Sequence, residues 1–267
     1  MPALSIYQVD AFTSHIFGGN PAAVVPLEAW LPDSVMQNIA IENNLSETAF
    51  FIPDGDGFYL RWFTPTYEID LCGHATLATA FVILTQLYPE RESVTFKTNV
   101  AGDLIVRKNS DALTMDFPVR AGEKIDIKDI PALVLESLGS PTPIEAYKAR
   151  DLMLVYDNEE FVRNAKPDFS KLIQYPDAVI ITSKTKDKNY DFISRFFCPY
   201  DMGIPEDPVT GSAHCTLTPY WAKRLSKHEL KARQVSERGG DLDLKTDGDR
   251  LYITGKAVLY MVGKFYI

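Results

Sequence analysis

The chain has 267 residues, 46% of them apolar, which is enough to form one large core or two smaller ones. A net charge of −9 and an isoelectric point near 5.0 argue against partnership with nucleic acid or an anionic membrane. The absence of a CxxC pair, of a signal-like start and of an apolar run of about 20 residues predicts free thiols, no structural zinc site, no membrane span and a cytoplasmic location.

The first half of the chain alternates strand and helix patterns. In chain order, we expect strands at 7–12 and 22–27, a helix at 33–44, strands at 48–53 and 58–64, a helix at 73–87, and strands at 93–99, 103–109 and 112–118. Asp33 is the predicted N-cap of the first helix. The second helix has no charged residue, so we expect it to be buried on most sides.

The second half predicts a similar series. We expect a short helix at 130–139, a strand at 151–156, a polar helix at 169–174, strands at 178–182 and 191–197, a helix from Gly211 to about Lys223, and closing strands. The span 118–143, which contains prolines and charges, is the expected joint.

An internal repeat relates the two halves. Gly73 and Gly211 each follow a glutamate by five residues and precede an alanine by two, at an offset of 211 − 73 = 138. The same offset relates Gly102 to Gly240, Asp103 to Asp241, Leu104 to Leu242, Asp111 to Asp249, Leu113 to Leu251 and Met115 to Ile253; upstream it is 134, with Arg61 matching Arg195 and Phe63 matching Phe197. We therefore predict two similar α+β domains, residues 1–118 joined by a closing strand at about 258–267, and residues 119–257.

Both predicted central helices begin with a turn of small residues, Cys72-Gly73-His74-Ala75 and Thr210-Gly211-Ser212-Ala213. Backbone N–H groups at a helix start suit a carboxylate or another anion. The plain alternative is that glycine only permits close packing there. Since this helix start occurs twice, we favour an anion site. If the domains face each other about a twofold axis, we expect both helix starts in one cleft.

Two further segments carry candidate site residues. Glu47 in LSETAFF stands among apolar, β-prone neighbours, where poor hydration suits a proton-transferring group, although a strand-edge glutamate with its head in water explains the same pattern. In PEDPVTGSAHC, Asp207 and Ser212 form a polar cluster able to orient a ligand, or simply an N-cap loop.

Two other kinds of site have little support. A Ser-His-Asp hydrolase is disfavoured because the chain has no G-x-S-x-G elbow. A metal site shared by Cys72, His74, His214 and Cys215 is also disfavoured, because the last two are adjacent in a helix and point to different faces. We therefore assign no metal ligands.

The segments YQVDAFTSHIFGGNPAAVV, LSETAFF, FTPTYEIDLCGHATLATA and EDPVTGSAHC together resemble the phenazine-biosynthesis PhzF-like isomerase family. The resemblance implies the diaminopimelate-epimerase fold, in which two pseudo-symmetric domains each wrap a mostly antiparallel sheet around a central helix, with the active site between them. It also implies a homodimer, a small carboxylate-bearing substrate and no cofactor.

The family's site residues carry over by local motif. The resemblance makes Glu47 the general acid and base, and His74, Asp207, Ser212 and the helix starts at Gly73 and Gly211 the substrate-binding set. Epimerases of this fold use two opposed cysteines, but Cys72 is matched here by Thr210, whose hydroxyl is too weak an acid for that role. We therefore expect a cofactor-independent isomerase; the alternatives are an amino-acid racemase or epimerase using Cys72 with Glu47, and a non-catalytic metabolite-binding protein.

Overall fold

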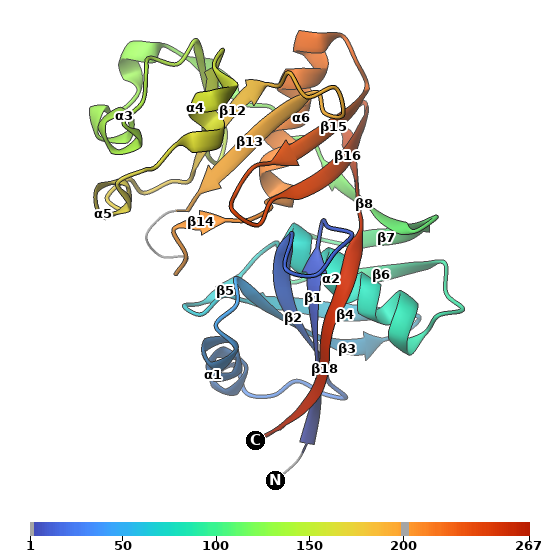
Figure 1. Ribbon diagram of the computed structural model, residues 1–267. Coiled ribbons are helices and arrows are strands. Elements are labelled where there is room, and N and C mark those ends of the chain that lie inside the picture. Colours follow the sequence, from blue (N-terminus) through green and yellow to red (C-terminus); the bar gives the residue numbers. More distant parts are fainter. Residues whose placement is uncertain (1–2, 199–202) are drawn as a thin grey trace. The chain divides into compact units, whose positions relative to one another are not determined.

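The computed structural model describes residues 3–198 and 203–267. The chain divides into two compact units, unit 1 formed by Met1–Phe117 with Tyr252–Ile267, and unit 2 formed by Pro118–Leu251 (Figure 1). The chain thus returns to unit 1 at Tyr252, before the predicted position near 258. The hydroxyl oxygens of Thr254 and Thr114, 2.7 Å apart, already tie this segment to unit 1.

Unit 1 is an α+β structure around helix α2. Its elements are β1 (Ala3–Ala11), β2 (Asn20–Pro26), α1 (Asp33–Asn43), β3 (Glu47–Asp54), β4 (Gly57–Phe63), β5 (Glu68–Ile69), α2 (Gly73–Val82), the π-helix η1 (Ile83–Leu87), β6 (Ser93–Lys97), β7 (Leu104–Asn109), β8 (Ala112–Pro118), the end of β17 (Arg250–Gly255) and β18 (Ala257–Tyr266). The strands pair in the order β18, β1, β2, β3, β4, β6, β7, β8. Among these pairs, β2 with β3 and β4 with β6 are parallel.

Unit 2 repeats this plan around helix α6. Its elements are β9 (Glu123–Ile125), η2 (Ile127–Asp129), α3 (Ala132–Leu138), β10 (Glu145–Lys148), β11 (Leu152–Tyr156), α4 (Glu159–Asn164), α5 (Phe169–Leu172), β12 (Val179–Lys184), β13 (Phe192–Phe197), β14 (Glu206–Asp207), α6 (Gly211–Leu225), β15 (Glu229–Gln234), β16 (Gly240–Asp247) and the start of β17. The strands pair in the order β9, β10, β11, β12, β13, β15, β16. Again two pairs are parallel, β11 with β12 and β13 with β15.

The duplication extends to side chains. The short strand before each central helix pairs in the same register, Phe63 opposite Glu68 in unit 1 and Phe197 opposite Glu206 in unit 2. Each glutamate accepts two hydrogen bonds from the arginine two residues before that phenylalanine, at 2.7 and 2.6 Å from Arg61 and at 2.7 Å twice from Arg195. Two structurally matched fork-shaped ion pairs confirm that the repeat read from the sequence is a structural one.

Several predicted details differ from the structure. Asp33 is the first residue of α1 and not its N-cap, which is Pro32; the Asp33 carboxylate pairs with Arg61 at 2.9 Å instead. The helix predicted to reach Leu87 is α-helical only to Val82 and continues as η1. The elements β9, β10 and α4 were not predicted, because the first two are short and α4 has mixed polarity.

Helix α2 forms the centre of unit 1, and all of its residues except Phe81 are buried. It packs against β1, β2, β3 and β18, which is possible because the helix has no lysine, arginine, aspartate or glutamate and many small side chains. At Gly255 a Cβ atom would lie 2.4 Å from the Phe12 ring and 3.2 Å from Leu77. Glycine therefore permits the close approach of the returning chain to α2.

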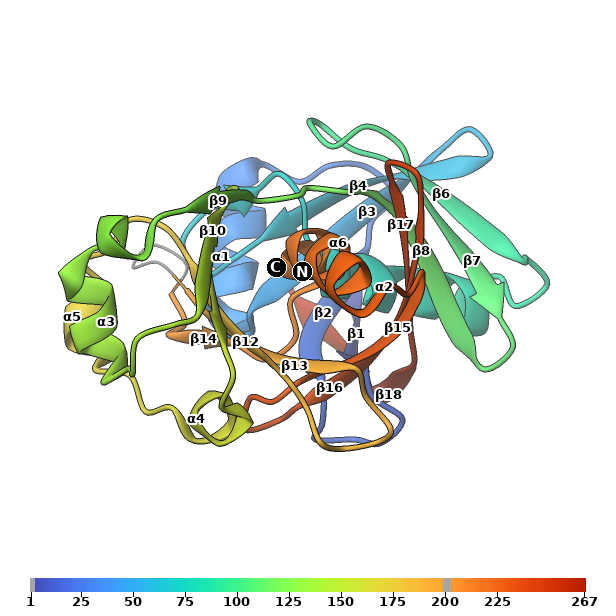
Figure 2. The same cartoon turned by 90° about the horizontal axis from the view of Figure 1, so that it is seen from above.

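Helix α6 occupies the corresponding place in unit 2, beside β15 and β16 (Figure 2). Its first eight residues are buried except Ser212, whereas its last turn carries Lys223 and Arg224. Basic side chains in the last turn complement the negative end of the helix dipole.

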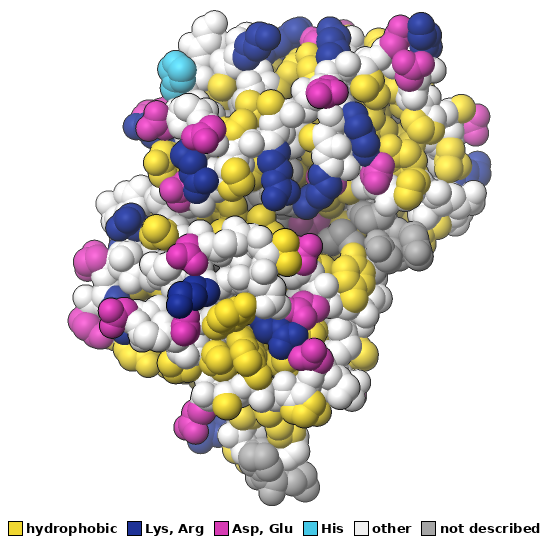
Figure 3. All heavy atoms as spheres, turned by 180° about the vertical axis from the view of Figure 1, so that it is seen from behind, with side chains coloured by type: hydrophobic (Ala, Val, Ile, Leu, Met, Phe, Trp, Pro, Cys, Tyr) yellow, Lys and Arg dark blue, Asp and Glu magenta, His cyan; other side chains and the backbone are white. Residues whose placement is uncertain are grey.

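The surface carries both signs of charge. On the face shown in Figure 3, lysine and arginine side chains are interspersed with aspartate and glutamate. None of the helices within residues 3–198 and 203–267 combines the length and apolarity required to cross a bilayer.

Candidate active site

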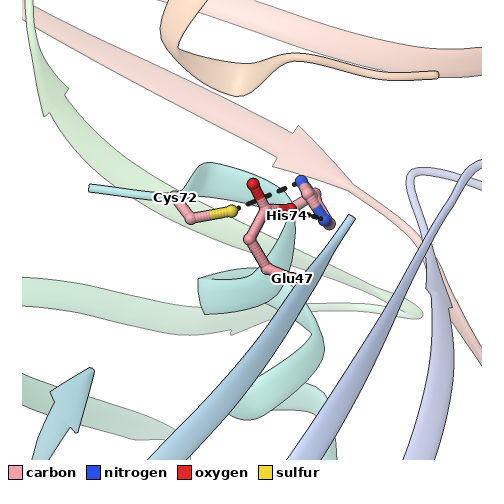
Figure 4. Close-up of side chains that lie close together, drawn as sticks. All are labelled: Glu47, Cys72 and His74. Atoms are coloured by element: carbon pink, nitrogen blue, oxygen red, sulfur yellow. Dashed lines mark hydrogen bonds and ion pairs between the residues drawn. The ribbon is translucent and has the colours of Figure 1, made fainter. Parts of the chain in front are cut away.

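A buried ion pair lies at the start of α2. Glu47 is the first residue of β3, where the parallel pairing places it opposite Ala22 of β2, and His74 is the second residue of α2. Nε2 of His74 lies 2.9 Å from Oε2 of Glu47, and the two side chains are 3% and 4% exposed (Figure 4). The distance is that of an ion pair. The geometry does not meet the criteria for a hydrogen bond, and neither atom forms one with another described residue.

The other ring nitrogen of His74 has two neighbours. Nδ1 lies 3.0 Å from the side-chain amide nitrogen of Asn20 and 3.4 Å from Sγ of Cys72. An amide carries a donor and an acceptor, so Asn20 can serve a neutral ring in one orientation and an imidazolium in the other. Asn20, the first residue of β2, therefore orients the ring in either protonation state.

The environment of His74 favours its charged form. Burial by itself lowers the pKa of His74, but negative charge at Cys72 and Glu47 outweighs burial and raises that pKa well above its ordinary value. Burial, with the charge of Glu47, raises the pKa of Cys72 to about 11. The thiol is thus protonated at neutral pH, and we attribute the stabilisation of the imidazolium to the Glu47 carboxylate.

In unit 2 a second polar cluster precedes α6. Asp207, which is 6% exposed, accepts a hydrogen bond of 2.5 Å from the hydroxyl of Thr210. The fully buried amide of Gln234 donates to the Asp207 carbonyl at 2.6 Å and accepts from the Thr210 N–H at 2.8 Å. Gln234 therefore fixes the loop that presents Asp207.

Ser212, the second residue of α6, matches His74 by the repeat offset. Its hydroxyl accepts a hydrogen bond of 3.1 Å from Arg150, and Arg150 also forms a two-bond ion pair with Asp151. Both units thus place a polar side chain against the second residue of the central helix. In unit 1 Asn20, the first residue of β2, contacts His74, and in unit 2 Arg150, between β10 and β11, contacts Ser212.

The two glycines begin the central helices as expected. Gly73 and Gly211 are buried first residues of α2 and α6, and the N-caps Cys72 and Thr210 make no side-chain cap hydrogen bond. Cys72 is extended at φ −134° and Thr210 at φ −112°. The backbone at both helix starts therefore has the same form.

The other histidine and cysteine of the sequence prediction have different surroundings. His214 donates from Nδ1 to the Thr210 carbonyl at 2.8 Å, and burial lowers its pKa to about 4, so it is neutral. Burial raises the pKa of Cys215 to about 11. Within the described ranges, Cys72 and His74 cluster with Glu47. His214 and Cys215 are not part of that cluster.

Sequence reasoning did not single out Asn20, Gln234 or Arg150 as site residues. Asn20 and Gln234 are fully buried amides at the start of β2 and the end of β15. A lone polar residue at a strand end is common, so the signal that could have marked them was weak. Their roles depend on contacts made 54 and 24 residues away.

Two α+β units of one plan, each with a mostly antiparallel sheet around a central helix, define the class of two-domain isomerases with an epimerase-like fold. The family model described as phenazine biosynthesis-like protein, PhzC-PhzF, matches residues 9–263. The chain belongs to this family.

Individual relatives agree over nearly the whole chain. An uncharacterized isomerase of Pseudomonas aeruginosa is 46% identical over 265 residues, covering 99% of each chain. The crystal structure of a PhzF-family phenazine biosynthesis protein from Enterococcus faecalis is 47% identical, with a TM-score of 0.92 and 100% of each chain covered. A hydroxyproline epimerase from Agrobacterium vitis is 12% identical with a TM-score of 0.62 over 98% of this chain and 92% of the other, which shows the shared epimerase fold alone.

These findings confirm the predicted family and fold class. Each unit has a mostly antiparallel sheet around a central helix, as in the diaminopimelate-epimerase fold, and the protein is an isomerase. An isomerase that moves a proton needs a group that can accept the proton and return it, and the buried carboxylate at the start of α2 is the candidate.

Proposed function

We propose that the protein is a cofactor-independent isomerase that moves a proton on a small, carboxylate-bearing metabolite, with Glu47 as general acid and base. The observation that carries this proposal is the buried contact of 2.9 Å between Glu47 and His74. A carboxylate held almost out of water beside a cation is poorly hydrated, is fixed in place and has one proton-accepting oxygen without a hydrogen bond.

The proton transfer balances within substrate and enzyme. The Glu47 carboxylate takes a proton from an activated carbon, and the electron pair of the broken C–H bond delocalises into the adjoining unsaturated system. The carboxylic acid then returns the proton to a different carbon, which restores the carboxylate. His74 stays in place and its positive charge stabilises the electron-rich intermediate, an effect worth several kcal/mol in a dry site.

The remaining predicted residues have binding roles in this proposal. The helix starts at Gly73 and Gly211 attract the substrate carboxylate. Asp207, held by Thr210 and Gln234, and Ser212 orient the substrate. Three further points stay predictions: that both units contribute to one site, that the protein is a homodimer, and that it is cytoplasmic. Light scattering in solution tests the homodimer.

The test is solvent deuterium exchange. Candidate carboxylates are incubated in heavy water with the wild type and with Glu47→Gln, and deuterium uptake is followed by NMR. We expect a fall of about 100- to 10,000-fold in Glu47→Gln. Glu42→Gln, at an exposed position of α1, is the matched control and keeps the wild-type rate. Deuterium exchange at the wild-type rate in Glu47→Gln would show that Glu47 is not the general acid and base.

One observation favours a second candidate, an amino-acid racemase or epimerase. Cys72 is in the same buried cluster, with Sγ 3.4 Å from His74. Against it, the pKa of Cys72 is raised to about 11 and Thr210 stands at the repeat-related position. Inversion of an α-carbon that is lost in Cys72→Ser supports the racemase, whereas saturable ligand binding with no proton exchange supports a non-catalytic binding protein.

A further inference from the structure

Unit 1 brings three chemically different metal-binding groups together. Glu47, Cys72 and His74 each offer one donor atom, and these atoms all lie within 4.8 Å of one another. Figure 4 shows the three side chains converging at the start of α2. The thiol and the imidazole come from the helix start, and the carboxylate comes from β3.

The separations suit one small cation. In tetrahedral zinc sites the bonds are about 2.0 to 2.3 Å, which puts neighbouring donor atoms about 3.3 to 3.7 Å apart. Here one donor atom of each residue lies within 4.8 Å of the others. Cys72 and Glu47 contact opposite ring nitrogens of His74, Nδ1 at 3.4 Å and Nε2 at 2.9 Å, and only one of these nitrogens can bind a given ion. Side-chain rotations that close a gap of about 1 Å therefore direct one atom of each residue at a common centre.

Two of these donor atoms also lack a hydrogen bond. Oε2 of Glu47 and Nε2 of His74 are buried without a hydrogen bond among the described residues, in side chains that are 4% and 3% exposed. Such atoms normally carry an energetic cost, which coordination to a cation removes. This is a second reason, separate from proximity, to expect a ligand at this place.

We propose that Glu47, Cys72 and His74 form a binding site for Zn²⁺ and that the bound ion inhibits the isomerase. One thiolate, one imidazole and one carboxylate suit zinc, whereas Mg²⁺ and Ca²⁺ require oxygen ligands. Binding releases the thiol proton of Cys72 and any second proton of His74 to solvent, and water completes the coordination. The inhibition rests on the proposed function, because a metal-bound Glu47 oxygen cannot accept a substrate proton.

Unit 2 provides a built-in comparison. The repeat puts Thr210 and Ser212 where unit 1 has Cys72 and His74, and the Thr210 hydroxyl donates to Asp207. Neutral hydroxyls are poor ligands for zinc. We therefore expect one ion for each chain, bound in unit 1.

Binding is tested without activity, by titrating the reduced protein with Co²⁺ and then displacing it with Zn²⁺. The expected result is one equivalent of Co²⁺ with a sulfur-to-cobalt charge-transfer absorption that Zn²⁺ abolishes. In Cys72→Ala the absorption disappears and the affinity for Zn²⁺ falls at least about tenfold, since even outer-shell substitutions cost about 10- to 100-fold. The matched control Cys215→Ala, which removes another buried thiol, behaves as the wild type.

The site is overturned if no stoichiometric binding occurs, or if Cys72→Ala binds Zn²⁺ as tightly as the wild type. Inhibition is measured separately by deuterium exchange with added Zn²⁺. We expect the wild type and Cys215→Ala to be inhibited and Cys72→Ala to resist; undiminished exchange by the zinc-loaded wild type overturns the inhibition. If Glu47 has no catalytic role, exchange survives in Glu47→Gln while the cobalt spectrum of the wild type is unchanged, so the two proposals fail separately.

Discussion

Nε2 of His74 lies 2.9 Å from Oε2 of Glu47, although the residues are 74 − 47 = 27 positions apart and belong to different elements. The parallel pairing of β2 and β3 puts Glu47 at the strand end where Asn20 also lies. Asn20 then contacts the far side of the His74 ring at 3.0 Å. The ring is thus held between an amide and a carboxylate, an arrangement that fixes its position.

Asn20 is predicted to position His74 without touching the substrate. Asn20→Ala removes the contact with Nδ1, and we expect the deuterium-exchange rate to fall about 10- to 100-fold, as misplaced catalytic groups do, with a smaller change in KM. Asn20→Asp adds a carboxylate beside the ring, which raises the pKa of His74 further and moves the pH–rate profile to higher pH. Unchanged rates and an unchanged profile in both variants would contradict the positioning role.

Cys72 is predicted to react slowly with alkylating reagents. Its pKa of about 11 against an ordinary value near 9 makes the thiolate about 100-fold scarcer at neutral pH than in the unfolded chain. Mass spectrometry after timed exposure to iodoacetamide measures the rate, with the urea-unfolded chain as reference. Rapid alkylation of the native protein with loss of exchange activity would instead support the racemase.

His214 is predicted to reduce the stability of the protein in acid. Its pKa is lowered to about 4, so the unfolded chain binds the proton more tightly. The stabilising contribution is therefore complete above about pH 6.5 and is lost as pH falls to 4, up to about 3 kcal/mol. Urea unfolding at pH 7 and pH 4 should show a smaller pH dependence in His214→Asn. The exposed His228→Asn serves as control and should keep the wild-type dependence.

The two repeated ion pairs are predicted to contribute differently to the free energy of unfolding. Glu206→Gln removes the charged partner of the nearly buried Arg195, which keeps its contacts with the Ala165 carbonyl and the Phe197 ring, and we expect the free energy of unfolding to fall by about 3 kcal/mol. Glu68→Gln leaves Arg61 paired with Asp33, and we expect about 1 kcal/mol or less. Comparing the unfolding of both variants in urea checks the order. Equal losses, or a larger loss in Glu68→Gln, would show that Asp33 gives no compensation.

Much of the fold was predictable because its signals are local or repeated. The offset of 138 correctly placed the starts of α2 and α6 at Gly73 and Gly211. Alternation predicted most long strands. The end of α2 was missed because no glycine, proline or charge marks the change to a π-helix at Ile83. Strand β9 was missed because three residues are too few to show a period.

By itself, the sequence determined the family, the duplication and the identity of Glu47 and His74 as site candidates, since these depend on residue types and short spacings. Only the tertiary structure decided which side chains meet: that Glu47, Cys72 and His74 converge, that Asn20 supports the ring, and that Gln234 holds the Asp207 loop. The physical reason is that contacts across strand pairings bring together residues 24 to 54 positions apart. Burial then keeps Cys72 protonated and His214 neutral, whereas neighbouring negative charge outweighs burial and favours the charged form of His74.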